Sequence, residues 1–194
     1  LIFGGPNYHN EFEGQVEWLR KYPNIDFYVY RDGEVPFARL LGHLLDNLDL
    51  EVVKKMKLPS CHSLIDGQPY FGQLEQRLLD LNAIPSPYTL GLMEKFFDDP
   101  LVPSMQTNRG CPFACTFCVE GEDYYNKIGK VGLERKKLEV EYIVERVKTT
   151  KTLRVVDSNF GMFKDDIEFC QYLNKVQNRT SYPDYISCSA GKNQ

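Results

Sequence analysis

Three cysteines, Cys111, Cys115 and Cys118, lie close together, whereas Cys61, Cys170 and Cys188 stand singly. Small secreted domains spread their cysteines through a short, loop-rich chain to form disulfides, which is not the pattern here. Thiolates are also metal ligands, and the ligands of one metal centre must come close together. The clustered spacing therefore predicts metal ligation in a reducing compartment.

The spacing also narrows the kind of metal centre. Gaps of four and three residues let one loop place thiolates on three corners of a cubane iron–sulfur cluster, with no cysteine for the fourth iron. Bacterial ferredoxins use a different spacing, and structural zinc sites need four ligands. An iron with an open position can bind and polarise a substrate. An alternative stays open: Cys170 or Cys188 could supply a fourth ligand, which would make this a non-catalytic electron-transfer or structural zinc module.

The second half of the chain is predicted to position this loop with alternating strands and helices. The expected elements are strands at 102–108, 153–156 and 185–189, and helices over 133–148 and from about 165. Asp165 and Glu168 resemble a capping box at the start of the last helix. Asp157, Ser158 and Asn159 follow the strand at 153–156, where short polar residues are typical of a turn or of a site at strand ends.

The first half also alternates strands and helices, which predicts parallel βαβ units. Residues 1–5 are expected to end a buried strand, 11–21 to form a helix, 26–30 a strand, and 60–71 a hairpin about Asp66-Gly67. A further helix is predicted from an apolar stripe with helical spacing. The stripe consists of Phe37, Leu40, Leu41, Leu44, Leu45 and Leu48. The predicted domains are 1–81 and 102–194, joined by a proline-rich linker at 82–101.

Composition sets outer limits on function. The 194 residues are 42% apolar with a net charge of −4, typical of a globular protein without the basic surplus of a nucleic-acid binder. No apolar run approaches the ~20 residues of a membrane span. The first residues lack the basic region of a signal peptide, so we expect a cytoplasmic protein that binds neither nucleic acid nor membrane.

The cysteine loop resembles the signature of the radical S-adenosylmethionine (radical SAM) superfamily. The resemblance lies in Cys-x-x-x-Cys-x-aromatic-Cys, preceded by Arg109-Gly110 and followed by a βα repeat. It implies that the three cysteines hold a 4Fe–4S cluster whose open iron chelates the methionine moiety of SAM. The reduced cluster then breaks the C5′–S bond, and a 5′-deoxyadenosyl radical abstracts hydrogen from a substrate. By position, Phe117 would lie beside the adenine, and Asp157, Ser158 and Asn159 would hold the methionine end, although they differ from the usual Gly-Gly-Glu.

The first half is similar to radical SAM enzymes with an N-terminal cobalamin-binding domain. The similarity rests on Gly4-Gly5-Pro6, on the strand that leads into Gly33-Glu34, on the Asp66-Gly67 hairpin and on the linker at 84–88. It implies that Gly4, Gly5, Gly33 and Glu34 contact cobalamin. The turn Arg31-Asp32-Gly33-Glu34 departs from the usual Gly-Glu-Gly-Glu.

Together these resemblances imply an α/β fold: the C-terminal part of a Rossmann-like cobalamin-binding-type domain, followed by the first half of a radical SAM partial TIM-type barrel. The implied activity is that of a radical SAM enzyme fragment acting on a small molecule, with methyl transfer or rearrangement as the outcome. The implied cofactors are a 4Fe–4S cluster, S-adenosylmethionine and cobalamin, and the implied electron donor is a flavodoxin- or ferredoxin-type protein. The substrate and the catalytic residues are not identified by the sequence.

Overall fold

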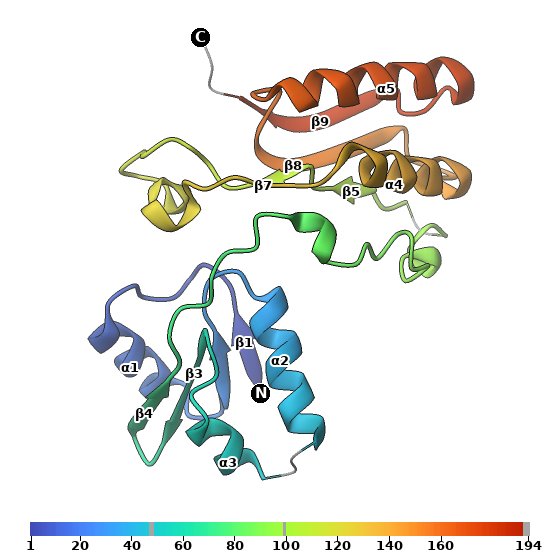
Figure 1. Ribbon diagram of the computed structural model, residues 1–194. Coiled ribbons are helices and arrows are strands. Elements are labelled where there is room, and N and C mark those ends of the chain that lie inside the picture. Colours follow the sequence, from blue (N-terminus) through green and yellow to red (C-terminus); the bar gives the residue numbers. More distant parts are fainter. Residues whose placement is uncertain (47–48, 99, 192–194) are drawn as a thin grey trace. The chain divides into compact units, whose positions relative to one another are not determined.

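The computed structural model describes residues 1–46, 49–98 and 100–191. The chain divides into two compact units, Leu1–Arg77 and the part from Leu78 onward, each with its own sheet (Figure 1). The α/β fold class predicted from the sequence is confirmed. Leu48, the last residue of the predicted apolar stripe, lies outside the described residues.

The first unit is built on a four-stranded sheet in the order β1-β2-β3-β4. Its elements are β1 Ile2–Gly4, α1 Phe12–Lys21, β2 Phe27–Val29, α2 Glu34–Asp46, α3 Leu50–Lys55, β3 Cys61–Ile65 and β4 Gln68–Phe71. Only β1 and β2 are parallel, so the prediction of repeated parallel units holds for β1-α1-β2 alone. After α3 the chain returns to the end of β2, where the Tyr30 amide donates to the Ser60 carbonyl at 2.8 Å. As a result β3 runs antiparallel, and the predicted hairpin about Asp66-Gly67 follows it.

Helices α1 and α2 cover opposite faces of this sheet. Phe27 and Val29 pack with Leu40 of α2, whereas Tyr28, between them, packs with Leu19 of α1, as expected of side chains that alternate along a strand. The sheet covers only part of the apolar stripe on α2. Leu40 is buried, whereas Phe37, Leu41 and Leu45 are exposed. The expectation of a buried first strand was wrong: β1 is an edge strand, and Phe3 is exposed.

His62 lies in an aromatic cluster on the α1 side of this sheet. Its ring stacks on Phe71 at 4.1 Å, and its Nδ1 lies 3.3 Å from the Tyr8 hydroxyl. Burial lowers the pKa of His62 to about 4. Trp18 packs edge-on against Tyr8 at 5.3 Å, so its fluorescence reports on this cluster.

We predict that buried His62 makes the first unit sensitive to mild acid. The folded pKa lies below the unfolded value of about 6.5. The unfolded chain therefore binds the proton first, and stability falls as the pH drops from about 6.5 to about 4, by roughly 3 kcal/mol at most. Urea unfolding followed by Trp18 fluorescence should show a weaker pH dependence for His62→Phe than for wild type. His9→Gln, at an exposed histidine, should behave as wild type. If the free energy of unfolding changed equally with pH in wild type and in His62→Phe, this prediction would be contradicted.

The second unit contains a parallel three-stranded sheet in the order β5-β8-β9 and a short ribbon of β6 and β7. Its elements are β5 Ser104–Met105, β6 Asn108–Arg109, β7 Gly129–Lys130, α4 Leu133–Arg146, β8 Thr152–Phe160, α5 Lys164–Thr180 and β9 Tyr185–Ala190, with short 3-10 turns at Leu81–Ala83, Glu94–Phe96, Val119–Gly121 and Asp123–Tyr125. The predicted strand at 102–108 is divided between β5 and β6. Strand β8 is longer than predicted, because the polar residues 157–159 lie inside it rather than after it.

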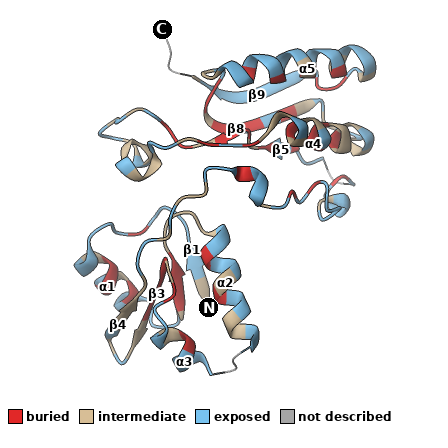
Figure 2. Cartoon of the chain, in the orientation of Figure 1, coloured by how far each residue is buried: buried red, intermediate tan, exposed pale blue. Residues whose placement is uncertain are grey.

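The core of the second unit lies between β8 and its two helices. Leu153 and Val155 of β8 pack with Ile143 of α4 and with Phe169 and Leu173 of α5. Figure 2 shows the buried residues along β8 and on the inner sides of these helices.

Residues from the predicted linker at 82–101 belong to the packing of this same unit. Tyr88 and Phe97 are part of its core, and the Tyr88 hydroxyl donates to the Ser104 carbonyl at 2.7 Å. Arg135 of α4 donates to the carbonyls of Leu81 and Ile84. These contacts attach the segment to β5 and α4. The domain boundaries at residues 81 and 102 stay a prediction.

The start of α5 differs from the predicted capping box. Asp166, rather than Asp165 or Glu168, accepts the amides of Gly161 and Phe163, each at 3.0 Å. Asp165 instead forms an ion pair with Lys130 at 2.7 Å. The loop between β8 and α5 is therefore closed by the buried side chain of Asp166 and not by the exposed side chain of Asp165.

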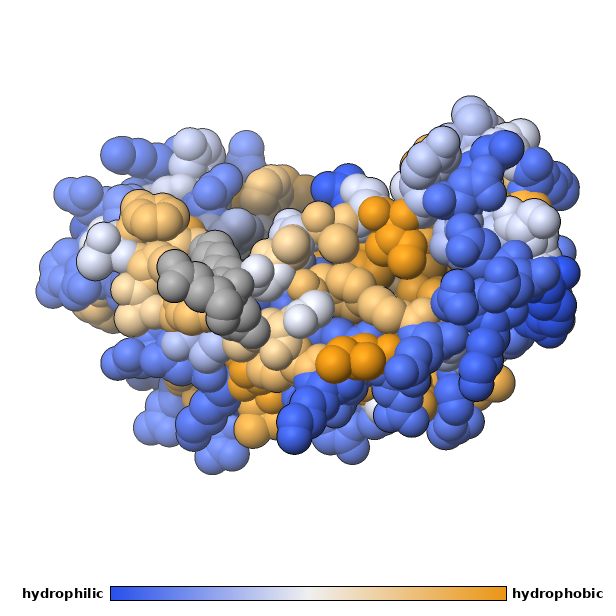
Figure 3. All heavy atoms as spheres, turned by 90° about the horizontal axis from the view of Figure 1, so that it is seen from above, coloured by the Kyte–Doolittle hydropathy of each residue, from blue (hydrophilic) through white to orange (hydrophobic). Residues whose placement is uncertain are grey.

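Several large apolar side chains of the second unit are exposed. They include Leu90, Leu92, Phe96, Leu101, Val102, Val156, Tyr185 and Ile186. On the face drawn in Figure 3, apolar residues gather over part of the surface with hydrophilic residues around them. Within the described ranges, no helix combines the length and apolar character needed to cross a membrane.

Candidate functional site: the cysteine loop and a glycine-lined pocket

The cysteine loop connects β6 to β7 and folds back on itself. The amide of Cys111 donates to the Tyr125 carbonyl at 3.0 Å, and the amide of Cys118 donates to the Cys115 carbonyl at 3.1 Å. Cys111 is buried, Cys115 and Cys118 are half-buried, and Phe117 is 88% exposed. The loop therefore turns Phe117 to solvent and keeps the first cysteine inside.

Gly121 allows the tightest approach in this loop. A Cβ atom at Gly121 would lie 2.2 Å from the carbonyl oxygen of Cys115 and 2.9 Å from its amide nitrogen. The Gly121 amide also donates to the Cys118 carbonyl at 3.0 Å. Glycine is therefore required where the turn after Cys118 crosses the backbone of Cys115.

Asp157 of β8 anchors the start of the loop. Its carboxylate accepts the backbone amides of Thr107 and Asn108, at 2.7 and 3.2 Å, the Asn108 side-chain amide at 2.8 Å, and the Thr107 hydroxyl. Asp157 is 1% exposed. Burial raises the pKa of this carboxyl, and the hydrogen bonds from Thr107 and Asn108 work in the opposite direction.

Asn159, two residues further along β8, reaches the first cysteine. Its side-chain amide nitrogen lies 3.1 Å from the Cys111 sulfur. Its Oδ1 is buried and has no hydrogen-bond partner among the described residues. Pairing of β8 with β9 is irregular between Val155 and Phe160, and bulges of this kind often re-aim side chains beside functional sites.

Residues 157–159, all predicted to hold the methionine end, therefore have different surroundings. Asp157 and Asn159 are buried against the loop, whereas Ser158 between them is half-buried and its neighbour Val156 is exposed. The structure thus brings Asp157 and Asn159 to the cysteine loop, a contact that the sequence reasoning missed. The partners are about 50 residues apart in the chain, and no local pattern indicates the pairing.

Among the residues that the structure describes, no three His, Cys, Asp or Glu side chains are gathered closely enough to hold a metal ion. The loop nevertheless offers a suitable donor set for an iron–sulfur cluster: three thiols on one segment, with an amide N–H already directed at one sulfur. Cys61 is buried in the first unit, where its thiol faces the Pro36 carbonyl at 3.9 Å, and Cys170 and Cys188 are exposed on α5 and β9.

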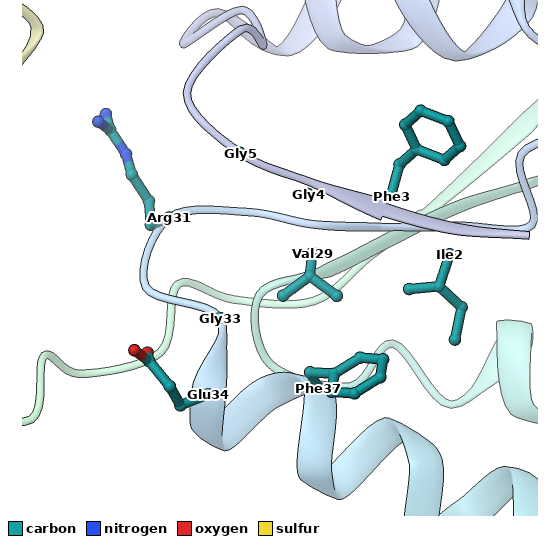
Figure 4. A pocket seen from close by; sticks show the side chains of 9 residues that line it. All are labelled: Ile2, Phe3, Gly4, Gly5, Val29, Arg31, Gly33, Glu34 and Phe37. Carbon is teal, nitrogen blue, oxygen red and sulfur yellow. The ribbon is translucent and has the colours of Figure 1, made fainter. Parts of the chain in front are cut away.

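The first unit contains a pocket of about 490 Å³ at the C-terminal ends of β1 and β2. All four residues predicted to contact cobalamin line it: Gly4, Gly5, Gly33 and Glu34. In Figure 4 the side chains of Ile2, Val29 and Phe37 point into one apolar space, and Arg31 and Glu34 lie at the same end of it as Gly5. Gly5 has a φ of +118°, which side chains rarely tolerate.

Arg31 occupies the position in this turn where the family pattern has glycine. Its φ of +70° lies in the left-handed region that favours glycine. Its guanidinium donates to the Asn10 side chain at 3.0 Å and lies 4.8 Å from the Tyr30 ring centre. These contacts offset the backbone strain, so the turn keeps its glycine-like shape with a larger residue.

Comparison with known proteins supports the resemblance seen in the sequence. Two curated relatives match the entire chain. One is 2-(S-pantetheinyl)-carbapenam-3-carboxylate methyltransferase from Streptantibioticus cattleyicolor, 28% identical over 200 residues. The other is the cobalamin-dependent radical SAM methyltransferase TokK from Streptomyces tokunonensis, 27% identical over 205 residues. No protein-family model matches the chain.

Two solved structures share the fold. The cobalamin-dependent SAM radical enzyme OxsB matches 90% of the chain with a TM-score of 0.60 and 19% identity. The radical SAM methyltransferase TsrM from Kitasatospora setae, solved with cobalamin and a [4Fe-4S] cluster, matches 94% with a TM-score of 0.59 and 14% identity. This chain is similar in sequence and in fold to cobalamin-dependent radical SAM enzymes.

The match covers only part of each radical SAM relative. The chain spans 28% of the length of both curated relatives, 24% of OxsB and 35% of TsrM.

We predict that Gly121→Ala disrupts the cysteine loop. The added methyl group overlaps the backbone of Cys115, and relieving such overpacking costs about 1–3 kcal/mol. Iron and sulfide analysis after anaerobic reconstitution should show less cluster than in wild type. Gly42→Ala is the matched control, because a Cβ there meets nothing within 4 Å. Equal iron content in wild type and Gly121→Ala would contradict the predicted role of the close approach.

Proposed function

We propose that this chain is the part of a cobalamin-dependent radical SAM methyltransferase that holds the iron–sulfur cluster and contacts the corrinoid. In this proposal residues 1–81 are the later part of a Rossmann-like domain, and 102–194 are the first half of a partial TIM-type barrel, joined through 82–101. The observation that carries it is the loop of three cysteines held against the end of a parallel strand by Asp157 and Asn159.

The cysteine loop provides the cluster site in this proposal. Cys111, Cys115 and Cys118 would bind three irons and leave one position for SAM. When bound, the cluster supplies the electron that breaks the C5′–S bond of SAM, and cobalamin supplies a carrier for the methyl group. Ser158 is the residue of β8 best placed for SAM, because Asp157 is already occupied by the loop. Phe117, which is exposed, would be free to pack on the adenine.

The glycine-lined pocket provides the corrinoid contact. Gly4, Gly5 and Gly33 leave open space at the ends of two parallel strands, where α/β sheets commonly bind ligands. Val29 and Phe37 add apolar surface, and Glu34 adds a hydrogen-bond acceptor. The proposed partners are a small-molecule substrate and a flavodoxin- or ferredoxin-type electron donor.

Cysteine substitution tests the cluster assignment. Anaerobically reconstituted protein, once reduced, should convert SAM to 5′-deoxyadenosine, measured by liquid chromatography. Cys115→Ala should lose cluster iron and this product, because one of three ligands is gone. Cys170→Ala should retain both, since the proposal needs no fourth cysteine.

Two results would reject the cluster assignment. An intact cluster in the full-length protein that yields no 5′-deoxyadenosine would reject the radical SAM hypothesis. A requirement for Cys170 or Cys188 equal to that for Cys115 would favour the electron-transfer or zinc module instead.

Filling the pocket tests the corrinoid contact. Gly33→Phe should weaken the binding of hydroxocobalamin at least about tenfold, which corresponds to ~1.4 kcal/mol of binding free energy. The phenylalanine ring would occupy the space between β2 and α2. The fold should tolerate the change, since a Cβ at Gly33 meets only Val29, at an ordinary 3.5 Å. Gly42→Phe, on the exposed side of the same helix, is the control. Binding is followed by the corrinoid absorption spectrum, and equal affinity of the two variants would reject the pocket.

A further inference from the structure

We propose that Asn159 is a positioning residue that donates a hydrogen bond to the sulfur of Cys111 and thereby raises the reduction potential of the cluster. The inference rests on the proposed function, because it assumes that Cys111 binds the cluster. It adds a role for a residue that the sequence resemblance assigns to the methionine end of SAM.

The contact is short and shielded from water. The amide nitrogen of Asn159 lies 3.1 Å from the Cys111 sulfur, and the two residues are only 1% and 4% exposed. Hydrogen bonds in such an environment are electrostatically stronger than in water. A donor at this place therefore acts on the sulfur without competition from solvent.

The chemistry of the two groups fixes which end of the amide faces sulfur. A cysteine sulfur that ligates iron is a thiolate, which accepts hydrogen bonds and is repelled by a carbonyl oxygen. The Oδ1 of Asn159 has no partner among the described residues, so no competing contact rotates the amide the other way. The nitrogen is thus the end that faces Cys111.

Asp157 fixes the distance between Asn159 and Cys111. Its carboxylate holds Thr107 and Asn108, which precede Cys111 by four and three residues. Asp157 and Asn159 lie two residues apart on β8, so a single strand holds both the start of the loop and its first cysteine. The position of Asn159 relative to Cys111 therefore depends on β8 and not on the loop alone.

A hydrogen bond to a ligating sulfur favours the reduced cluster. Reduction adds one electron and makes the cluster and its thiolates more negative, and the N–H dipole stabilises that added charge. No covalent bond changes and no proton is transferred. Loss of the donor should therefore move the midpoint potential to more negative values.

The test is an anaerobic redox titration of the reconstituted protein, monitored by electron paramagnetic resonance in the absence of SAM. Asn159→Leu has a similar volume and no donor. Its midpoint potential should be more negative by about 59 mV or more, which for one electron corresponds to at least a tenfold change in the reduction equilibrium constant. Asn159→Gln keeps the amide and should recover part of the shift. Val156→Ala, at an exposed neighbour on β8, should leave the potential unchanged.

A second variant covers the case in which Asn159→Leu does not load iron. Asn159→Asp keeps the shape but places a carboxylate against the sulfur, so its cluster should again have a lower potential than wild type. In wild type prepared with 15N-labelled asparagine, a nitrogen hyperfine coupling to the cluster is expected, and it should be absent from Asn159→Asp.

Failure of the inference and failure of the proposed function give different results. Normal cluster content with equal potentials in wild type, Asn159→Leu and Asn159→Asp would overturn the inference alone. A wild-type protein that binds no iron–sulfur cluster would overturn the proposed function, and this inference with it.

Discussion

The cysteine loop depends on one buried carboxylate. Asp157 has almost no contact with solvent, and a buried charge without partners would destabilise the fold strongly. Four donors from Thr107 and Asn108 surround it instead. Because two of these donors are backbone amides, the carboxylate fixes the path of the chain as well as two side chains. The loop that carries the cysteines begins only two residues later, so its starting direction is set by β8.

Strand β8 divides its residues between two tasks. Leu153 and Val155 fill the core under α4 and α5, and the buried positions that follow, Asp157 and Asn159, are polar and face the loop. The change from apolar to polar coincides with the irregular pairing to β9. Asp157 and Asn159 keep the alternation of Leu153 and Val155, so the change from apolar to polar residues is what lets the end of the same strand serve the site. Stability and site geometry therefore come from consecutive stretches of one strand.

Sequence reasoning succeeded where the signal was local. The hairpin at Asp66-Gly67 and the helical periodicity of α1, α4 and α5 are each contained in a short window, and each element is present. It failed where a distant partner decides. Residues 157–159 have the composition of a turn, but β8 continues through them to Phe160, which pairs with Ala190 of β9. Asp157 also accepts hydrogen bonds from Thr107, which is distant in the sequence. Asp166 caps α5 in place of Asp165 because its side chain reaches the amides of Gly161 and Phe163.

The two units use the ends of parallel strands in opposite ways. At the ends of β1 and β2 the glycines remove side chains and leave a pocket, and only their backbone shape is required. At the ends of β5 and β8 the site is filled by buried polar side chains that bind each other and the loop. Arg31 shows that the first arrangement tolerates a change of residue if new contacts hold the turn. The second tolerates less, because removing any one member of the Asp157 network leaves a buried group without a partner. Substitutions should therefore be better tolerated around the pocket than around the cysteine loop.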